Sequence, residues 1–491
     1  MDSYKNDLLL INAFSWTTEK RTCYLPYGVL YLAGFLRQKG ITVDIYDRNT
    51  DYSLDIQKCI DYFKEQKPPI VGLSVLTGPV IADALKISRQ IKSISPKTCV
   101  VWGGLHPTIF PHYVFNEDSV DFIIQGEGEL AMFELCRALL DNKPYSGIKN
   151  LGFKDNGRIV LNPIREELLD LDTNDVPAWD LLDIKHYVAN RFFASRVLTM
   201  NTSRGCPFKC TFCFNQGLPY QRWRGLSAAK IKKQIDYLYK NYGINGIQFY
   251  EDSFDTDKKR VREFCDIMLG SGMNQRIKWS HFSNIPYFDP EAVSYEKKAG
   301  LRYIEYGVES GAQRILDWVN KRQTVDEIKE VFEQCRKIGI KTAALFMIGF
   351  PDESYEELMM TVDLVERLPA HILICTIYRP YPGTPLFDYC VRSKKFAPPQ
   401  ELEEQAEFYR FSHMNEDELN MSNVPTRVLL GLQKRFYAKF VIMEAMLCIK
   451  EFNFGLLIYY LKQQIQPSAI LYTLKALLAR LGLGGREKIS R

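Results

Sequence analysis

The feature that most constrains the fold is an alternation of short apolar runs with helix-length segments, which occurs twice along the chain. The first alternation contains five candidate strands, at 8–13, 42–46, 70–76, 98–102 and 122–125. Segments with a helical period lie between them, for example at 28–39 and 80–93. Short apolar strands separated by helices indicate a parallel sheet covered on both faces. Residues 1–141 are therefore predicted to form a doubly wound, Rossmann-like α/β domain.

The stretch 142–190 has a different pattern. Asn156 and Gly157 lie between two short strand-like runs, and this dipeptide is a strong signal for a β-hairpin turn. Acidic, proline-containing sequence follows the hairpin. We interpret the whole stretch as a linker that leads to the next domain.

The second alternation predicts a barrel. It contains six candidate strands, at 197–201, 246–250, 277–282, 303–308, 343–348 and 373–378. Six strand–helix units indicate a partial (β/α)6 barrel of the TIM type over residues 191–390, and such barrels place their chemistry at the C-terminal ends of the strands. Residues 391–491 are expected to be mostly helical.

Size and charge exclude several classes of protein. A chain of 491 residues is too long for one compact core, and a net charge of +4 gives no reason to expect a nucleic-acid partner. The N-terminus lacks the apolar core and small-residue cleavage site of a signal peptide. No uninterrupted apolar run reaches the length of about 18 residues needed to span a bilayer. We expect a cytoplasmic protein.

Three of the 12 cysteines, Cys206, Cys210 and Cys213, lie within eight residues, directly after the first predicted barrel strand. Their spacing is C-x3-C-x2-C. Three thiolates can bind three irons of a cubane cluster, which leaves the fourth iron open for an outside molecule. Structural zinc needs four ligands, but no fourth cysteine or histidine lies nearby in the sequence. The next histidine upstream is His186, and the next cysteine downstream is Cys265. The triplet therefore predicts a reactive iron–sulfur site.

At these residues the chain resembles the radical S-adenosylmethionine superfamily, whose cysteine loop carries an aromatic residue before the last cysteine, here Phe212. The resemblance covers residues 195 to about 390. It implies a 4Fe-4S cluster on the three cysteines and a bound S-adenosylmethionine. The remaining contacts it implies are Glu251 and Asp252 with the ammonium group, Glu309 and Ser310 with the ribose and carboxylate, and Ile348 and Gly349 along the adenine.

Elementary chemistry supports those roles. Carboxylates suit an ammonium group and a diol, and glycine lets the backbone approach an adenine closely. Each short motif alone is more often a helix cap or a turn. Their joint order, with each motif at a strand end, is what carries the prediction.

The N-terminal domain resembles the cobalamin-binding domain found ahead of many radical S-adenosylmethionine enzymes. The resemblance lies at three strand ends on one edge of the sheet, where doubly wound folds bind ligands. It implies cobalamin contacts at Ser74, Leu76, Gly103, Gly104, Gly126 and Glu127.

The cobalamin motif is incomplete in one place. Where related methyltransferases carry an axial histidine, this chain has Asn49. We interpret His106, the nearest histidine by motif, as a structural residue at a strand end rather than a ligand. The alternative for the whole domain is a degenerate fold that has lost cobalamin and serves as a scaffold or lid.

The resemblance implies a class B methyltransferase-like enzyme that methylates an unactivated carbon of a small-molecule or lipid-like substrate. The alternative is oxidative ring closure or rearrangement without methyl transfer, as in porphyrin biosynthesis. A methylthiotransferase would carry three further cysteines in its N-terminal domain, and Cys23, Cys59 and Cys99 have superficially suitable separations. Cys59 lies in a helical pattern and Cys99 begins a buried strand, so we interpret these cysteines as core residues. A non-enzymatic sensor would not need the S-adenosylmethionine contacts.

Two kinds of partner are expected. An external donor such as flavodoxin or ferredoxin would reduce the cluster. The apolar and basic segments 436–443, 454–460 and 471–483 suggest either peripheral contact with a membrane or, as we favour, helices packed on the barrel mouth.

Overall fold

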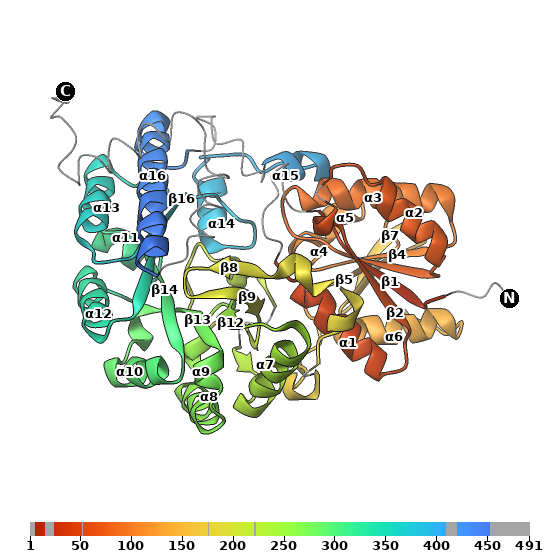
Figure 1. The fold of residues 1–491 in the computed structure, drawn as a ribbon. Helices are drawn as coiled ribbons and strands as arrows, with labels where there is room; N and C mark the ends of the chain where they lie inside the picture. The colour runs from red at the N-terminus through yellow and green to blue at the C-terminus, as the bar shows by residue number, and fades with distance from the viewer. Residues whose placement is uncertain are drawn as a thin grey trace.

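The computed structural model describes residues 5–14, 24–51, 53–174, 176–219, 222–408 and 420–451. Two lobes lie side by side (Figure 1). The N-terminal lobe is built on one seven-stranded sheet and the second lobe on another. Both predicted α/β units are therefore present, with helices of the C-terminal region above them.

The first sheet has the order β2-β1-β3-β4-β5-β6-β7, and its first five strands are parallel. Its strands are β1 (Leu8–Asn12), β2 (Val43–Asp47), β3 (Ile70–Ser74), β4 (Cys99–Gly103), β5 (Phe122–Ile124), β6 (Leu151–Asp155) and β7 (Arg158–Leu161). Its helices are α1 (Tyr27–Gln38), α2 (Gln57–Gln66), α3 (Val80–Ile94), α4 (Leu105–Ile109), α5 (Pro111–Val114) and α6 (Glu129–Leu140).

Alternation along these strands fills two separate layers. Leu8 and Leu10 pack on the face that α1 and α6 cover, whereas Leu9 and Ile11 pack on the face of α2 and α3. The core on the α1 side continues into the core of the second lobe. This is the doubly wound arrangement that the sequence predicted.

The hairpin predicted at Asn156 and Gly157 is present, but it is not part of a linker. Both residues have positive φ angles, 47° and 79°, as a tight hairpin turn of type I′ requires. β6 pairs antiparallel with β5, so the hairpin extends the first sheet. The first sheet therefore ends at Leu161 rather than before residue 142, because β5 leaves an edge that a further strand can cover.

The second sheet has the order β16-β15-β14-β13-β12-β9-β8 and does not close. Its strands are β8 (Ala189–Arg191), β9 (Ala194–Met200), β12 (Gly246–Phe249), β13 (Lys278–Ser283), β14 (Leu301–Glu309), β15 (Lys341–Ile348) and β16 (Ile372–Ile377). The six predicted strands form its parallel part, and β8 adds an antiparallel edge that the sequence did not reveal. A separate short ribbon is made of β10 (Ser203–Arg204) and β11 (Arg224–Gly225).

Helices cover the outer face of this half barrel. They are α7 (Ala228–Tyr242), α8 (Lys258–Gly270), α9 (Met273–Arg276), α10 (Pro290–Lys298), α11 (Gln313–Trp318), α12 (Val325–Ile338) and α13 (Tyr355–Arg367). Thr324 and Ser354 each begin a helix with a capping box, which fixes where α12 and α13 start after the strand ends.

The C-terminal region is helical where it is described, with α14 (Pro385–Arg392), α15 (Leu402–Phe408) and α16 (Thr426–Lys450). α16 packs along β16, the open edge of the half barrel, and α15 packs on α3 of the first lobe (Figure 1). The apolar segment 436–443 lies within α16, while 454–460 and 471–483 lie outside the described residues. Among the described helices, none combines the length and apolar character that a bilayer crossing requires.

Candidate active site

The cysteine loop begins where β9 leaves the sheet. Gly205, with φ of +82°, turns the chain from β10 into the loop, and a β carbon there would lie 2.7 Å from the Arg222 carbonyl oxygen. The amide of Thr211 donates to the Val319 carbonyl at 3.0 Å, and the Leu386 amide donates to the Thr211 carbonyl at 3.0 Å. The loop is therefore fixed to the helices beyond β14 and β16.

The three predicted ligands are free thiols that interact with one another. Burial raises the pKa of Cys206 to about 11 and that of Cys213 to about 12, and the neighbouring thiols add to both increases. Burial also raises the pKa of Cys210, against the effect of the Lys321 ammonium group. A positively charged cluster would reverse this preference, because thiolates are its ligands.

The donor set fits a cubane. Within the described ranges, no three Cys, His, Asp or Glu side chains converge as they would around a single metal ion. A cubane does not require that geometry, because its three thiolates bind three different irons. The residues that would hold it are Cys206, Cys210 and Cys213.

Lys321 is a residue of this site that the sequence did not reveal. Its ammonium group lies 2.9 Å from Oε1 of Glu309, and both side chains are buried. Glu309 itself stands at the end of β14 with φ of +66°. Burial opposes the charge of Lys321, but Glu309 and Cys210 keep its pKa above the ordinary value. The predicted contact Glu309 is thus present as half of an ion pair beside the cysteines.

The two acids predicted to bind the ammonium group have different environments. Glu251 is buried and accepts hydrogen bonds from the amides of Thr202 and Ser203, the latter at 2.7 Å, while Arg260 lies 3.6 Å away. Its carboxylate is therefore used to hold the end of β9. Asp252 is exposed and accepts one hydrogen bond from Asn215 at 3.0 Å, so of these two acids Asp252 is the one that presents a carboxylate beside the cysteine loop.

Ser310 and Ile348 are both fully buried. The hydroxyl of Ser310 lies 3.1 Å from that of Thr361 and accepts a hydrogen bond from the Ala312 amide. Ile348 packs outward, in a cluster with Leu429 of α16. Their side chains contribute to shape, because they already have partners within the protein.

The remaining predicted residues of the S-adenosylmethionine site, Phe212 and Gly349, occupy the top of the barrel. The ring of Phe212 packs against Phe350 at a centroid distance of 5.9 Å. Gly349 has φ of +76° and donates its amide to the carboxylate of Glu353 at 2.5 Å. Backbone, rather than side chain, is what Gly349 can present to an adenine.

A cavity of about 310 Å³ lies between the two lobes. Five of the six residues predicted to contact cobalamin line it: Ser74, Gly103, Gly104, Gly126 and Glu127. The other, Leu76, is 51% exposed and is not among the lining residues. Asn201, Thr202, Ser203 and Arg204 form the opposite wall, so the end of β9 faces the cobalamin-binding edge.

The cavity wall fits a large flat ligand. A β carbon added to Gly28 or Gly103 would meet no atom within 4 Å, so these positions leave open space beside the backbone. Gly104 has φ of +103°, and a β carbon there would lie 3.0 Å from the Val75 carbonyl oxygen. One carboxylate oxygen of Glu127 is buried without a hydrogen bond, and its charged neighbour Arg204 lies 3.5 Å away. A ring with polar side groups would cover the glycines and reach that oxygen.

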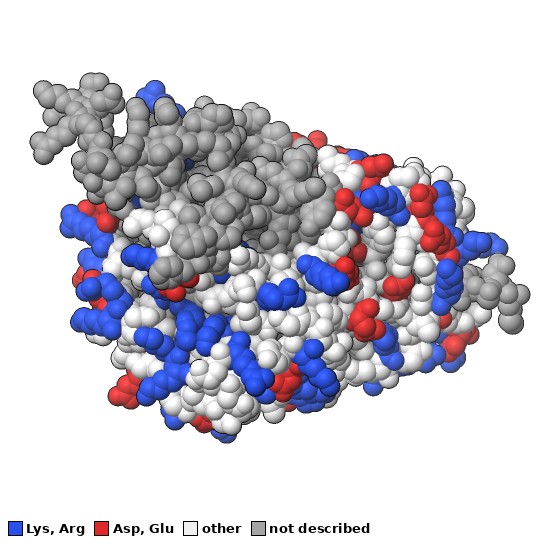
Figure 2. Space-filling view, in the orientation of Figure 1, with Lys and Arg blue, Asp and Glu red and all other residues white. Residues whose placement is uncertain are grey.

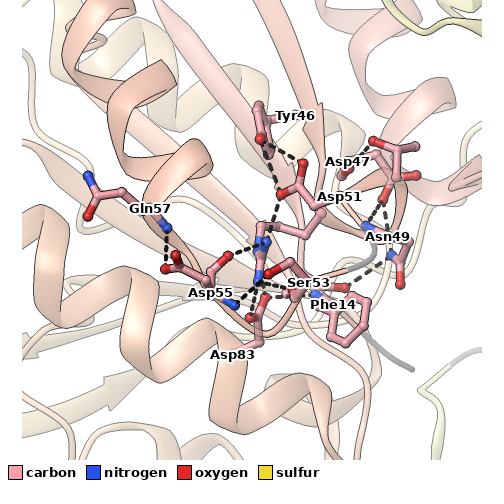
Figure 3. Close-up of polar contacts among 12 residues, drawn as sticks. Phe14, Tyr46, Asp47, Asn49, Asp51, Ser53, Asp55, Gln57 and Asp83 are labelled. Atoms are coloured by element: carbon pink, nitrogen blue, oxygen red, sulfur yellow. Dashed lines mark hydrogen bonds and ion pairs between the residues drawn. The ribbon is translucent and has the colours of Figure 1, made fainter. Parts of the chain in front are cut away.

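Asn49, which stands where related methyltransferases carry an axial histidine, makes hydrogen bonds within the protein. The Asn49 amide donates to Asp47 at 3.0 Å and to the Ala13 carbonyl at 3.3 Å. Beside it, the guanidinium group of Arg48 binds Asp83 at 2.9 Å and Asp51 at 2.7 Å, in a cluster buried at the strand ends (Figure 3). These residues do not line the cavity.

His106 is also a structural residue in this fold. It is fully buried, its Nδ1 lies 3.3 Å from the Thr77 hydroxyl, and its ring packs against Phe110. Burial lowers the pKa of His106 to about 3. It does not line the cavity.

Polar side chains lie on the concave face of the half barrel. The Gln248 amide donates to Oε1 of Glu305 at 2.7 Å, which joins β12 to β14 across β13. Ser280 of β13 is fully buried, and its hydroxyl has no hydrogen-bond partner. Burial raises the pKa of Glu305 to about 7, against the effect of the Gln248 hydrogen bond. Side chains along a strand point alternately to its two faces. The polar residues within these strands were therefore the sequence signal that could have predicted this group.

Comparison with known proteins places both halves of the chain. The radical SAM superfamily model matches residues 200–365, and the B12 binding domain model matches residues 18–135. The chain is 32% identical over 368 residues to an uncharacterized methyltransferase of Pyrococcus horikoshii, which covers 74% of this chain and 78% of that protein.

A second relative carries a different activity in its name. The chain is 31% identical over 402 residues to the anaerobic magnesium-protoporphyrin IX monomethyl ester cyclase of Cereibacter sphaeroides, which covers 79% of this chain but 62% of the cyclase. Among solved structures, the radical S-adenosylmethionine methyltransferase TsrM of Kitasatospora setae has a TM-score of 0.67 at 20% identity, over 79% of this chain and 76% of that one. At that identity the likeness concerns the fold.

The two family models match the same parts of the chain that form the cysteine loop and the cavity wall. The radical match begins at the end of β9, includes the cysteine loop and continues to α13. The B12 match contains the strand ends that line one wall of the cavity. The cofactors of such a protein are a 4Fe-4S cluster, S-adenosylmethionine and cobalamin. The chain belongs to the radical S-adenosylmethionine superfamily, as a cobalamin-dependent radical enzyme.

Proposed function

We propose that the enzyme transfers a methyl group from cobalamin to an unactivated carbon of a small-molecule or lipid-like substrate. The observation that carries this proposal is the cavity that both lobes share. One wall is the glycine-rich edge of the first sheet, and the other is the end of β9, from which the cysteine loop starts. A corrin ring in this cavity would lie beside the radical site.

The protein contributes binding and orientation. When bound, the reduced cluster and S-adenosylmethionine supply a radical able to take hydrogen from carbon, and cobalamin supplies the methyl group. Cys206, Cys210 and Cys213 would hold the cluster, and Asp252 would meet the ammonium group. The Lys321–Glu309 pair places a buried positive charge beside the thiolates. Gly103 and Gly104 would let the ring lie against the backbone and exclude water from that face.

A second candidate function is oxidative ring closure without methyl transfer. The likeness to the cyclase of Cereibacter sphaeroides favours it, since the two sequences are 31% identical. Both candidates use the same radical site. They differ in whether a methyl group reaches the product.

Isotope labelling separates the two candidates. The purified protein is reconstituted without oxygen, supplied with hydroxocobalamin and trideuteromethyl-labelled S-adenosylmethionine, and incubated with a small-molecule and lipid extract. Methylcobalamin, 5′-deoxyadenosine and a product carrying the labelled methyl group are the expected result. 5′-Deoxyadenosine with an oxidised, unlabelled product would instead support ring closure. The Cys206→Ala variant is the control, and it is expected to form neither product.

We also propose that flavodoxin or ferredoxin supplies the electrons. Figure 2 shows lysine and arginine side chains over the lower part of the barrel lobe, with few acidic side chains among them. Such a surface favours encounter with an acidic electron carrier. Reduction of the cluster by flavodoxin should slow as salt is added, while reduction by dithionite provides the reference rate.

A further inference from the structure

Four charged side chains join the two lobes beside the cysteine loop. Arg204 of β10 lies 2.5 Å from Glu129, the first residue of α6, and 3.5 Å from Glu127. Arg224 of β11 forms an ion pair with Glu127. Glu127, Glu129 and Arg204 also line the cavity between the lobes. The cavity and the strand that leads to the cysteine loop therefore share these side chains, which we call the clamp.

The ribbon β10–β11 depends on the acids of the first lobe. Arg204 and Arg224 stand directly opposite each other in this antiparallel pair. Like charges in opposed positions destabilise a strand pairing. Glu127 and Glu129 supply two negative charges that offset them, and little solvent screens the contacts, because the side chain of Glu129 is 6% exposed and that of Arg224 is 16% exposed.

The ribbon in turn fixes the first cysteine ligand. Only Gly205 separates Arg204 from Cys206, and its positive φ and the closeness of the Arg222 carbonyl leave no room for a β carbon at this turn. Before the turn, Glu251 holds the Ser203 amide at 2.7 Å. The backbone at Cys206 is thus tied to the cavity wall through one intervening residue.

Two tyrosines of α1 add direct contacts between the lobes. The hydroxyl of Tyr27 donates to the carbonyl of Thr199, and that of Tyr31 donates to the carbonyl of Asn201 at 2.9 Å. Both tyrosines line the cavity. The residues just before the cysteine loop therefore contact helix α1 and helix α6, and they also line the cavity.

We propose that the clamp makes the binding of cobalamin and the binding of the cluster mutually dependent. A corrin ring in the cavity would restrict Glu127 and Glu129, and a cluster held by Cys206 would restrict the ribbon. Binding of either cofactor would restrict the motion of the clamp, so the second cofactor would lose less conformational entropy when it binds. Thermodynamic linkage then requires that each cofactor strengthen the binding of the other by the same factor.

The test compares the Kd of hydroxocobalamin for metal-free and for iron–sulfur-reconstituted protein, by equilibrium dialysis without oxygen. In the wild type, the cluster is expected to lower the Kd by about fivefold or more. In the double variant Glu127→Gln/Glu129→Gln, the ratio of the two Kd values is expected to fall to about one. Glu127 faces the cavity, so its replacement can change both Kd values, but the ratio reports the coupling alone.

Two further variants keep the test decisive. Glu403→Gln removes an exposed ion pair between α15 and α3, with Arg89 at 2.8 Å, and should leave the wild-type ratio. Arg204→Lys keeps the charge but loses the forked contact, and it should give an intermediate ratio even if the double variant does not fold. A wild-type ratio of one, or an unchanged ratio in Arg204→Lys and the double variant, would overturn the proposal. None of these measurements depends on methyl transfer.

Discussion

The two lobes prepare their ligand surfaces in opposite ways. In the first lobe, Gly103 and Gly104 line the cavity with backbone, and the space beside Gly103 is open. In the barrel lobe, the motif residues Glu251 and Ser310 are buried and bonded to other parts of the protein. The first surface is made by omitting side chains, and the second is shaped by side chains that serve the fold. Substitution of Gly103 should therefore affect mainly affinity, whereas substitution of Glu251 should affect mainly stability.

The largest expected effect is at Glu251. Glu251→Ala would leave the amides of Thr202 and Ser203 without their acceptor, and it would remove the carboxylate that lies 3.6 Å from the guanidinium group of Arg260. We expect the free energy of unfolding to fall by about 3–5 kcal/mol, because one member of a buried charged pair is removed. Urea denaturation of the cofactor-free protein measures this change.

The neighbouring Asp252→Ala variant is the matched control. Asp252 is exposed and accepts one hydrogen bond, from Asn215, so its loss should cost about 1 kcal/mol or less. The affinity of the Asp252→Ala variant for S-adenosylmethionine should fall instead. Equal losses of stability in the two variants would contradict the division between a shaping residue and a contacting residue.

The second effect is a dependence of barrel stability on pH. Burial raises the pKa of Glu305 to about 7, with Gln248 and Arg191 acting in the opposite direction. Because the folded protein binds this proton more tightly than the unfolded chain, the resulting stabilisation is present below the ordinary glutamate pKa and is lost as pH rises through about 7. Its size is about 3 kcal/mol.

Glu305→Gln should flatten this dependence, because glutamine keeps an acceptor for Gln248 but does not titrate. The difference in unfolding free energy between pH 5 and pH 8 should be smaller than in the wild type by about 1–3 kcal/mol. Some dependence should remain, since burial also raises the pKa of Glu353 to about 7. If the unfolding free energies of variant and wild type depended identically on pH, Glu305 would not be a titrating group of the concave face.

The fold could be predicted because its signals are local and repeated. Each of the six parallel barrel strands carries at least one buried apolar side chain, and each of the helices α7, α12 and α13 has a polar cap residue at its start. β8 was missed because three residues at an edge carry no usable period. The hairpin β6–β7 was recognised from its turn, but sequence alone did not show that it would pair with β5.

The site could be predicted only in part, for a related reason. Motif order located Glu251 and Ser310 at strand ends, but it did not say which neighbours their side chains would bind. Lys321 follows α11 without any motif, and its pairing with Glu309 depends on tertiary structure. Arg204 and Arg224 could have been noticed as two cations near the cysteines, but their partners lie in the other lobe.

The smallest expected effects test the glycine-lined surface itself. Gly104→Ala must adopt φ near +103° and approach the Val75 carbonyl, so it should destabilise the protein by about 1–3 kcal/mol. Gly103→Leu meets no protein atom at its β carbon, so its unfolding free energy should change by only about 0.5 kcal/mol. The leucine side chain would extend toward the cavity, and hydroxocobalamin binding, measured by dialysis, should weaken about tenfold or more. If Gly103→Leu instead lost stability and kept its affinity, the first lobe would resemble the barrel, and the open space beside Gly103 would not be a ligand surface.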